Sequence, residues 1–250
     1  LILLAILRWR GLALPRDLAS WRPFLFQAAF NSVLPFTMIA WAQQTTNASL
    51  ATILGSTSPI FIFLLTALVT HHERVSGRKL FGVVAGIAGI CLIIGYQALG
   101  GLGRELGSQL LILLSALSFG VAAIYGRRFG GLDPLLPACG SLLCGALVLI
   151  PLSLLVEHPW TLSPSPAAIG ALLGLAVFST ALAFVIYFQL LHSLGSLGTS
   201  AQAYLRVPIG VALGVLVLGE QLAPTAWLGL VCVIIGVIAM TVPARAQPPA

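Results

Sequence analysis

Residues 23–72 read PFLFQAAFNSVLPFTMIAWAQQTTNASLATILGSTSPIFIFLLTALVTHH, and none of these 50 residues is Asp, Glu, Lys or Arg. Residues 158–205 form a second uncharged stretch, 48 residues long. An α-helix needs about 20 apolar residues to cross a hydrocarbon core of roughly 30 Å, so each stretch can hold two spans. Four shorter uncharged stretches hold one span each: residues 80–103, 106–126, 134–156 and 221–244. This pattern predicts an all-α integral membrane protein with several transmembrane helices.

The composition argues against several classes of protein. Only 7% of the 250 residues are charged, and the mean hydropathy is +1.06. Soluble domains carry about 25% charged residues, so this chain has too little charge to cover a water-facing surface. A soluble enzyme, a nucleic-acid-binding protein and a disordered tail are all poor explanations of such a sequence. We expect the lipid bilayer as a partner, and no nucleic acid.

Turn-forming and polar residues divide the apolar stretches into separate helices. We expect full spans at residues 23–42, 48–70, 79–97, 106–126, 135–156, 167–191, 197–219 and 224–242. Residues 1–7 are apolar up to the first residue, and we expect them to be part of a further membrane helix.

Lys and Arg are unevenly divided between the two sides of these spans. When successive loops are assigned alternately to the two sides, ten of the twelve basic residues fall on one side: Arg8, Arg10, Arg16, Arg22, Arg74, Arg78, Lys79, Arg127, Arg128 and Arg245. Cytoplasmic loops collect Lys and Arg, so this side is expected to be the cytoplasm. The sequence therefore predicts a protein of the cell inner membrane whose C-terminus is cytoplasmic.

Two segments of the chain share a pattern of proline, glutamate and glycine. Pro59 and Pro208 are 149 residues apart, and three further pairs are each 147 apart: Glu73 and Glu220, Gly82 and Gly229, and Gly89 and Gly236. An odd number of helices separates equivalent points, so the two copies must be inverted relative to each other in the bilayer. Inverted repeats are typical of transporters, in which the two copies move about a site near the membrane midplane.

The repeat predicts about ten transmembrane helices in two inverted five-helix repeats, of which roughly eight full helices and one partial helix are present. We assign residues 1–97 to the first repeat, which is N-terminally incomplete. Residues 106–242 form the second repeat, and residues 243–250 form a cytoplasmic tail.

The same residues carry a resemblance to a known family. The first copy contains Asn47-Ala-Ser-Leu-Ala, Ser58-Pro59 and Glu73-Arg74, and the second contains Ala201, Pro208, Leu218-Gly-Glu-Gln221 and Leu228-Gly229. This pattern resembles the EamA-type transporters of the drug/metabolite transporter superfamily, although His71-His72 stand in the first copy where that family usually has Leu-Gly. The resemblance covers the whole chain. It implies alternating-access transport, typically export, of a small polar metabolite such as an amino acid or a related compound, with no cofactor and no named substrate.

Arg206 is the one charged residue that lies deep inside an expected span, away from its ends. It lies about nine residues into its helix, or roughly 13 Å at 1.5 Å per residue, which is near the midplane. A cation at this depth costs at least ~2.5–3.5 kcal/mol, so it must face protein or a water-filled cavity. Three interpretations stay open: Arg206 binds an anionic group of the substrate, it pairs with buried amides, hydroxyls and carbonyls, or its long side chain extends to the membrane surface. Gln202 lies four residues earlier and shares its helix face.

Uncharged polar residues are candidates for the same cavity. Gln27, Asn31 and Pro35 recur at a spacing of four residues, which places both amides on one polar stripe. Hydroxyl groups in membrane helices more often bond their own backbone than a ligand. We therefore predict a substrate-binding set that consists of Arg206, Gln202, Asn31, Gln27 and Tyr187.

Proline and glycine make further predictions about the helices. Pro35, Pro59 and Pro208 each free a backbone carbonyl, so we expect a bend at each of them. Pairs of glycines four residues apart permit close helix packing. Three such pairs are present: Gly82 and Gly86, Gly170 and Gly174, and Gly210 and Gly214.

Other functional classes have weaker support. The inverted repeat argues against a channel and against a scaffold that transports nothing. Residues 198–201 faintly resemble an intramembrane serine protease motif near His192, but the second glycine of that motif is absent, and we predict no catalytic residue. Cys91, Cys139, Cys144 and Cys232 lie in apolar segments without a His or carboxylate cluster, so we predict neither a metal site nor a disulfide.

Overall fold

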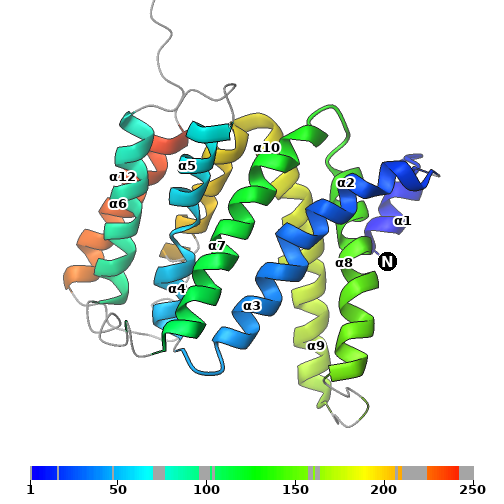
Figure 1. Cartoon of the computed structure of the whole chain (residues 1–250), viewed down its shortest axis with the longest axis horizontal. Coiled ribbons are helices and arrows are strands. Elements are labelled where there is room, and N and C mark those ends of the chain that lie inside the picture. The colour runs from blue at the N-terminus through cyan, green and yellow to red at the C-terminus, as the bar shows by residue number, and fades with distance from the viewer. Residues whose placement is uncertain are drawn as a thin grey trace, which may run out of the picture.

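The computed structural model of the chain is a bundle of helices (Figure 1). It describes residues 2–15, 17–46, 48–69, 77–95, 102, 105–156, 160, 164–205, 208–209 and 224–241. Every regular element within these residues is helical, and none of them is a strand. The prediction of an all-α protein is therefore confirmed.

The helices agree closely with the spans expected from the sequence. They are α1 (Ile2–Trp9), α2 (Leu18–Ala28), η1 (Ala29–Val33), α3 (Leu34–Ala42), α4 (Ala48–Gly55), α5 (Ser58–Val69), α6 (Gly77–Ile94), α7 (Leu106–Gly126), η3 (Arg127–Phe129), α8 (Leu135–Val156), α9 (Pro166–Gly174), η5 (Leu175–Leu182), α10 (Ala183–Ser200) and α12 (Pro224–Thr241). In this part of the chain, six helical segments are long and apolar enough to cross a membrane, and α12 adds a shorter apolar helix. The helix expected at 197–219 is described only as far as residue 205 and at 208–209.

Large apolar side chains cover much of the outer surface. Leu155 on α8, Leu172 on α9 and Phe178 on η5 are 76%, 64% and 67% exposed. A water-soluble protein rarely exposes such a continuous apolar surface, whereas lipid chains cover one without cost. Together with the six long apolar helices, this surface identifies an integral membrane protein.

Two of the expected proline bends coincide with irregular helix geometry. Pro35 has no N–H to donate to Asn31, and the preceding residues form the π-helix η1, in which the Leu34 N–H donates to the carbonyl of Ala29. Pro59 likewise leaves the Gly55 carbonyl without its helical donor, and α4 ends there. The Ser58 hydroxyl donates to that carbonyl at 2.6 Å. Pro208 lies next to residues outside the described part of the chain.

The chain leaves its helical path at Gly195, which has φ +75° and ψ 178°. This positive φ is a conformation that glycine adopts at little cost. It separates the long helix that starts at α9 from the next helical segment. That segment packs on α6, where the fully buried Tyr204 donates its hydroxyl to the Val83 carbonyl at 3.1 Å. The expected boundary between two spans, residues 191–197, is thus confirmed.

α7 lies in the middle of the bundle and packs against α3, α4 and α5. Figure 1 shows α6 and α12 side by side at one edge of the bundle and α8 and α9 at the other.

Close packing through glycine is confirmed for α6, where Gly82 lies against α12 and Gly86 lies against the ring of Tyr204. For Gly170 and Gly174 on α9, a Cβ at either position would meet no described atom within 4 Å, so the described part of the chain shows no such packing there. Gly210 and Gly214 lie outside the described residues.

Basic residues gather at one end of the bundle. α2 and α6 begin, and α7 ends, at the upper end in Figure 1. These termini carry Arg22, Arg78, Lys79, Arg127 and Arg128, and we call this end the basic end. Asp17 caps α2 there, and its hydrogen bonds from the Ser20 hydroxyl and N–H lower the pKa of its carboxyl group.

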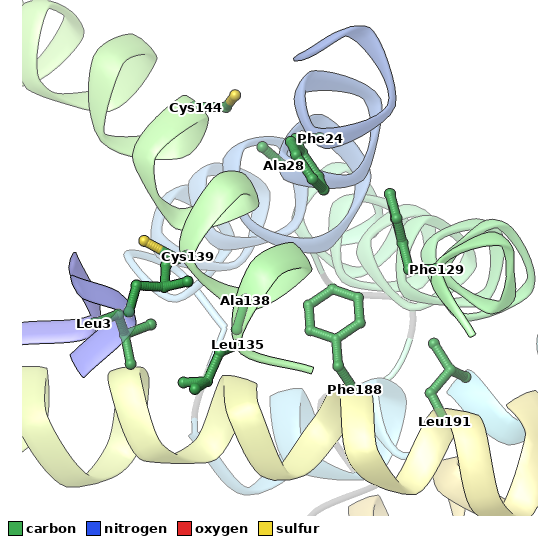
Figure 2. Packing of buried hydrophobic residues seen from close by; sticks show 11 residues of the cluster. Leu3, Phe24, Ala28, Phe129, Leu135, Ala138, Cys139, Cys144, Phe188 and Leu191 are labelled. Atoms are coloured by element: carbon green, nitrogen blue, oxygen red, sulfur yellow. The ribbon is translucent and has the colours of Figure 1, made fainter. Parts of the chain in front are cut away.

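The main apolar core lies near the basic end. Phe24 of α2, Phe129 of η3, and Phe188 and Leu191 of α10 pack together with the start of α8 (Figure 2). The ring of Phe129 stacks on Phe24 at a centroid distance of 5.3 Å and meets Phe188 edge-on at 6.0 Å. This packing closes the bundle between α2, α7 and α10.

Candidate functional site

A cavity of about 410 Å³ lies among the central helices. Its walls come from η1, α3, α4, α5, α7 and α10 and from residues 202–203. The lining reaches Gln43, an exposed residue at the end of α3 opposite the basic end. A volume of this size falls in the range of roughly 300–1,000 Å³ that is typical of small-molecule sites.

The cavity is polar but uncharged. Among the described residues that line it, none is Asp, Glu, Lys, Arg or His. The polar lining residues are Asn31, Gln43, Thr52, Ser58, Ser115, Tyr187, Ser196, Thr199, Ser200 and Gln202. Apolar residues, chiefly isoleucine and alanine, fill the remaining wall together with Phe119. Such a surface suits a small molecule that has hydrogen-bonding groups and some apolar area.

Four of the lining hydroxyls bond to nearby backbone carbonyls of the same membrane span. Ser58, Ser115, Thr199 and Ser200 donate to backbone carbonyls three or four residues earlier, at 2.6–2.7 Å. Their hydrogen atoms are therefore used within the helix, while their oxygen lone pairs can still accept a bond from a ligand. The sequence favoured this intrahelical bonding for hydroxyl groups as a class, and these four follow it.

Three of the five residues that the sequence singled out line this cavity. Asn31 is 7% exposed and lies in the π-helix η1, so the irregular turn before Pro35 carries the amide into the wall. Gln202 and Tyr187 approach from the α10 side of the cavity. The structure thus brings together two amides and a phenol from regions of the chain that are far apart.

The other two residues have different positions. Gln27 is completely buried one helical turn before Asn31, and it is not among the residues that line the cavity. Neither its Nε2 nor its Oε1 has a hydrogen-bond partner in the described part of the chain. Arg206 lies outside the described residues.

Sequence reasoning missed the contribution of α7. Ile112, Ser115, Phe119 and Ala123 line the cavity at spacings of three and four residues, which is one face of a helix. Hydropathy does not mark this face, because α7 is apolar on its lipid side as well. The repeated small residues of the segment are the one signal that points to it.

In the part of the chain that the structure describes, the remaining reactive groups do not assemble into a centre. Ser200 of the protease-like segment lines the cavity and bonds its own helix, whereas His192 lies beside Gly130 near the basic end. Within the described residues, no group of three or more His, Cys, Asp or Glu side chains is placed to hold a metal. All four cysteines are free thiols.

Comparison with known proteins extends these observations. The sequence profile of the EamA-like transporter family matches residues 1–95 and 106–242. The chain is 26% identical over 247 residues to the uncharacterized inner membrane transporter YedA of Escherichia coli K12, covering 96% of this chain and 77% of YedA. It is also 26% identical to a probable terminal-alkyne amino-acid exporter of Streptantibioticus cattleyicolor, over 77% of this chain and 63% of the exporter.

A solved crystal structure has the same fold. It superimposes with a TM-score of 0.80 over 96% of this chain and 83% of the other, at 18% sequence identity. Identity at this level shows a shared fold alone. The sequence match gives the family, and the structural match adds the shared fold.

Proposed function

Because the chain belongs to the EamA-like transporter family, we propose that it exports a small polar metabolite, such as an amino acid or a related compound, by alternating access through the central cavity. The cavity carries this proposal. Its volume, its three amide side chains and its hydroxyl acceptors fit a solute that forms several hydrogen bonds. One relative is named as a probable terminal-alkyne amino-acid exporter, and the substrate in that name is of the same class.

Asn31, Gln202 and Tyr187 are the proposed contacts in the described part of this site. An amide offers both donors and acceptors, so each of the first two can bind a carboxylate, an ammonium group or an uncharged polar group. Since the described lining has no charged residue, Arg206 is the proposed source of positive charge for an anionic substrate group. Its planar guanidinium suits a carboxylate.

The architecture proposed for this transport is two inverted repeats, residues 1–97 and 106–242, followed by the tail at 243–250. The basic end is proposed to face the cytoplasm, with the C-terminus on the same side. The cavity reaches Gln43 at the opposite end, so this arrangement corresponds to an outward-facing state. The membrane is proposed to be the cell inner membrane, as in the relative YedA.

A metabolite-resistance screen tests the proposal. Cells that overproduce the full protein are challenged with amino acids, purines and toxic analogues, and hits are checked by flux in membrane vesicles. We expect resistance to one chemical class, with flux that saturates as the concentration rises. Resistance to no compound together with no vesicle flux would contradict the proposal, and flux that does not saturate would favour a channel.

A further inference from the structure

Three walls of the cavity continue past it toward the basic end. Each wall has a residue that lines the cavity and, three or four residues nearer the basic end, a second residue on the same helix face. These pairs are Asn31 and Gln27, Tyr187 and Leu191, and Ala123 and Gly126. These continuations bring the three faces together one helical turn beyond the cavity.

The three faces meet at Gly126. A Cβ on Gly126 would lie 2.6 Å from Cδ2 of Leu191, 3.4 Å from Nε2 of Gln27 and 3.5 Å from Oε1 of Gln27. Gln27 is completely buried and Leu191 is 2% exposed. The absence of a side chain at Gly126 therefore allows α7 to close against both α2 and α10.

Open space exists on both sides of this contact. On one side is the cavity, which ends at Ala123 and Tyr187. On the other side is a void of about 10 Å³ that Gly126, Phe129, Phe188 and His192 line. The rings of Phe129 and Phe188, which line this void, pack together with the ring of Phe24 (Figure 2). The contact among Gln27, Gly126 and Leu191 thus lies between the cavity and this small void, and it is the narrow point between the two.

A polar side chain at this narrow point is unexpected. The Gln27 amide has two donor hydrogens and an acceptor oxygen, yet it has no hydrogen-bond partner within the described chain. Burying an unpaired amide raises the free energy of the closed arrangement. Separating α7 from α2 would hydrate the amide and remove that cost.

We propose that Gln27, Gly126 and Leu191 form the inner gate of the transport path. In this gate the unpaired amide of Gln27 favours opening and gives the substrate its next polar contact. The inference rests on the proposed transport function. It assigns to Gln27 a position beyond the cavity, which the substrate reaches only when the gate opens.

The variant Gln27→Leu tests the role of the amide. Leucine keeps a similar volume but removes the unpaired polar group, so the closed gate becomes more stable. We expect a higher melting temperature, a maximal transport rate lower by about ten-fold, and an unchanged KM for loading at the cavity. The matched control is Gln189→Leu, which replaces an exposed glutamine on α10 and is expected to change none of these values. A lower melting temperature, or transport at the parent rate, would overturn the proposal.

Thiol labelling tests the gate without using a substrate. In the full protein with all its native cysteines replaced, Gln27→Cys is treated with a water-soluble maleimide from each side of the membrane. We expect slow labelling, from the basic end only, that becomes at least several-fold faster when Leu191→Ala is added. Leu172→Ala, at an exposed position on α9, is the control. If Leu191→Ala leaves the labelling rate unchanged, the gate is refuted even if the protein transports a solute. If Leu191→Ala speeds up labelling but the protein transports nothing, the proposed function alone is refuted.

Discussion

Gly82 on α6 and Gly236 on α12 lie so close together that a Cβ on either residue would be 2.7 Å from the carbonyl oxygen of the other. Gly89 and Gly229 repeat this relationship at 2.6 and 2.5 Å. In the sequence repeat, Gly82 corresponds to Gly229 and Gly89 to Gly236, so exchanging the two copies converts one contact into the other. This is the arrangement that a two-fold axis between inverted copies would produce.

Replacing either member of an equivalent pair should therefore have the same effect. Gly82→Leu and Gly229→Leu each place a side chain against backbone atoms that cannot move aside. Overpacking of this kind lowers the free energy of unfolding by about 1–3 kcal/mol or more. We expect both variants to lose several degrees of melting temperature in detergent. Gly170→Leu is the control, because a Cβ there meets nothing within 4 Å in the described chain. Tolerance of leucine at one position but not at the other would contradict the two-fold relationship.

The amide of Asn31 should matter for transport more than for stability. Asn31→Leu removes a donor and an acceptor from the cavity wall, and we expect transport to fall by about ten-fold or more, as for the loss of a buried hydrogen bond to a ligand. The yield of folded protein should stay close to that of the parent. Gln44→Leu, at an exposed residue outside the cavity, is the control. Equal flux in parent and Asn31→Leu vesicles would remove Asn31 from the binding set.

Arg206 provides a sharper distinction between binding and structural support. If it binds an anionic substrate group, Arg206→Gln should insert and fold normally but lose transport, and Arg206→Lys should recover only part of it because the planar fork is lost. Flux and melting temperature are measured on the same preparations. A structural role makes the opposite forecast, in which Arg206→Gln lowers expression or melting temperature first.

The orientation of the bundle can be measured by labelling. Thr45 lies at the end of α3 and hydrogen-bonds Ser108 at 2.7 Å, whereas Gly131 follows η3 at the basic end. With single cysteines at these positions, we expect a membrane-impermeant thiol reagent to reach Gly131→Cys only from the cytoplasm and Thr45→Cys only from outside. Labelling of both cysteines from one side would contradict the helix count and the inversion together.

The sequence predicted the helices well because lipid imposes a simple requirement. A span must be long, apolar and nearly free of charge, and residues 23–72 and 158–205 show this directly. The breaks at Pro35, Pro59 and Gly195 also follow from local chemistry, since proline lacks a donor and glycine tolerates a positive φ.

The inward faces of the helices were harder to predict. In a soluble protein a polar face marks the outside of a helix, but here the lipid side and the packed side are both apolar. Hydropathy therefore gave no signal that α7 lines the cavity. For the same reason Gly82 and Gly170 belong to identical motifs, yet within the described residues only Gly82 lies against another helix. Whether a glycine packs depends on the partner that the fold brings to it.

The position of Gln27 illustrates the same limit at the site. Its spacing from Asn31 predicts that both amides lie on one helix face. That spacing does not reveal that the cavity ends between them, because the closure depends on Gly126 and Leu191, which come from distant parts of the sequence. A local pattern thus indicates which residues share a helix face, but not the contact at which the cavity ends.

Gly55 offers the most direct test that the cavity is the substrate path. It lines the cavity, and a Cβ there meets no described atom within 4 Å, so a large side chain can enter the empty space without displacing the helices. Gly170→Phe on α9 is the matched control, since that position is equally open but lies outside the cavity. The measurement is the initial rate of substrate flux into proteoliposomes for parent, Gly55→Phe and Gly170→Phe at equal amounts of folded protein. The account predicts loss of flux in Gly55→Phe and normal flux in Gly170→Phe, and normal flux in Gly55→Phe would contradict it.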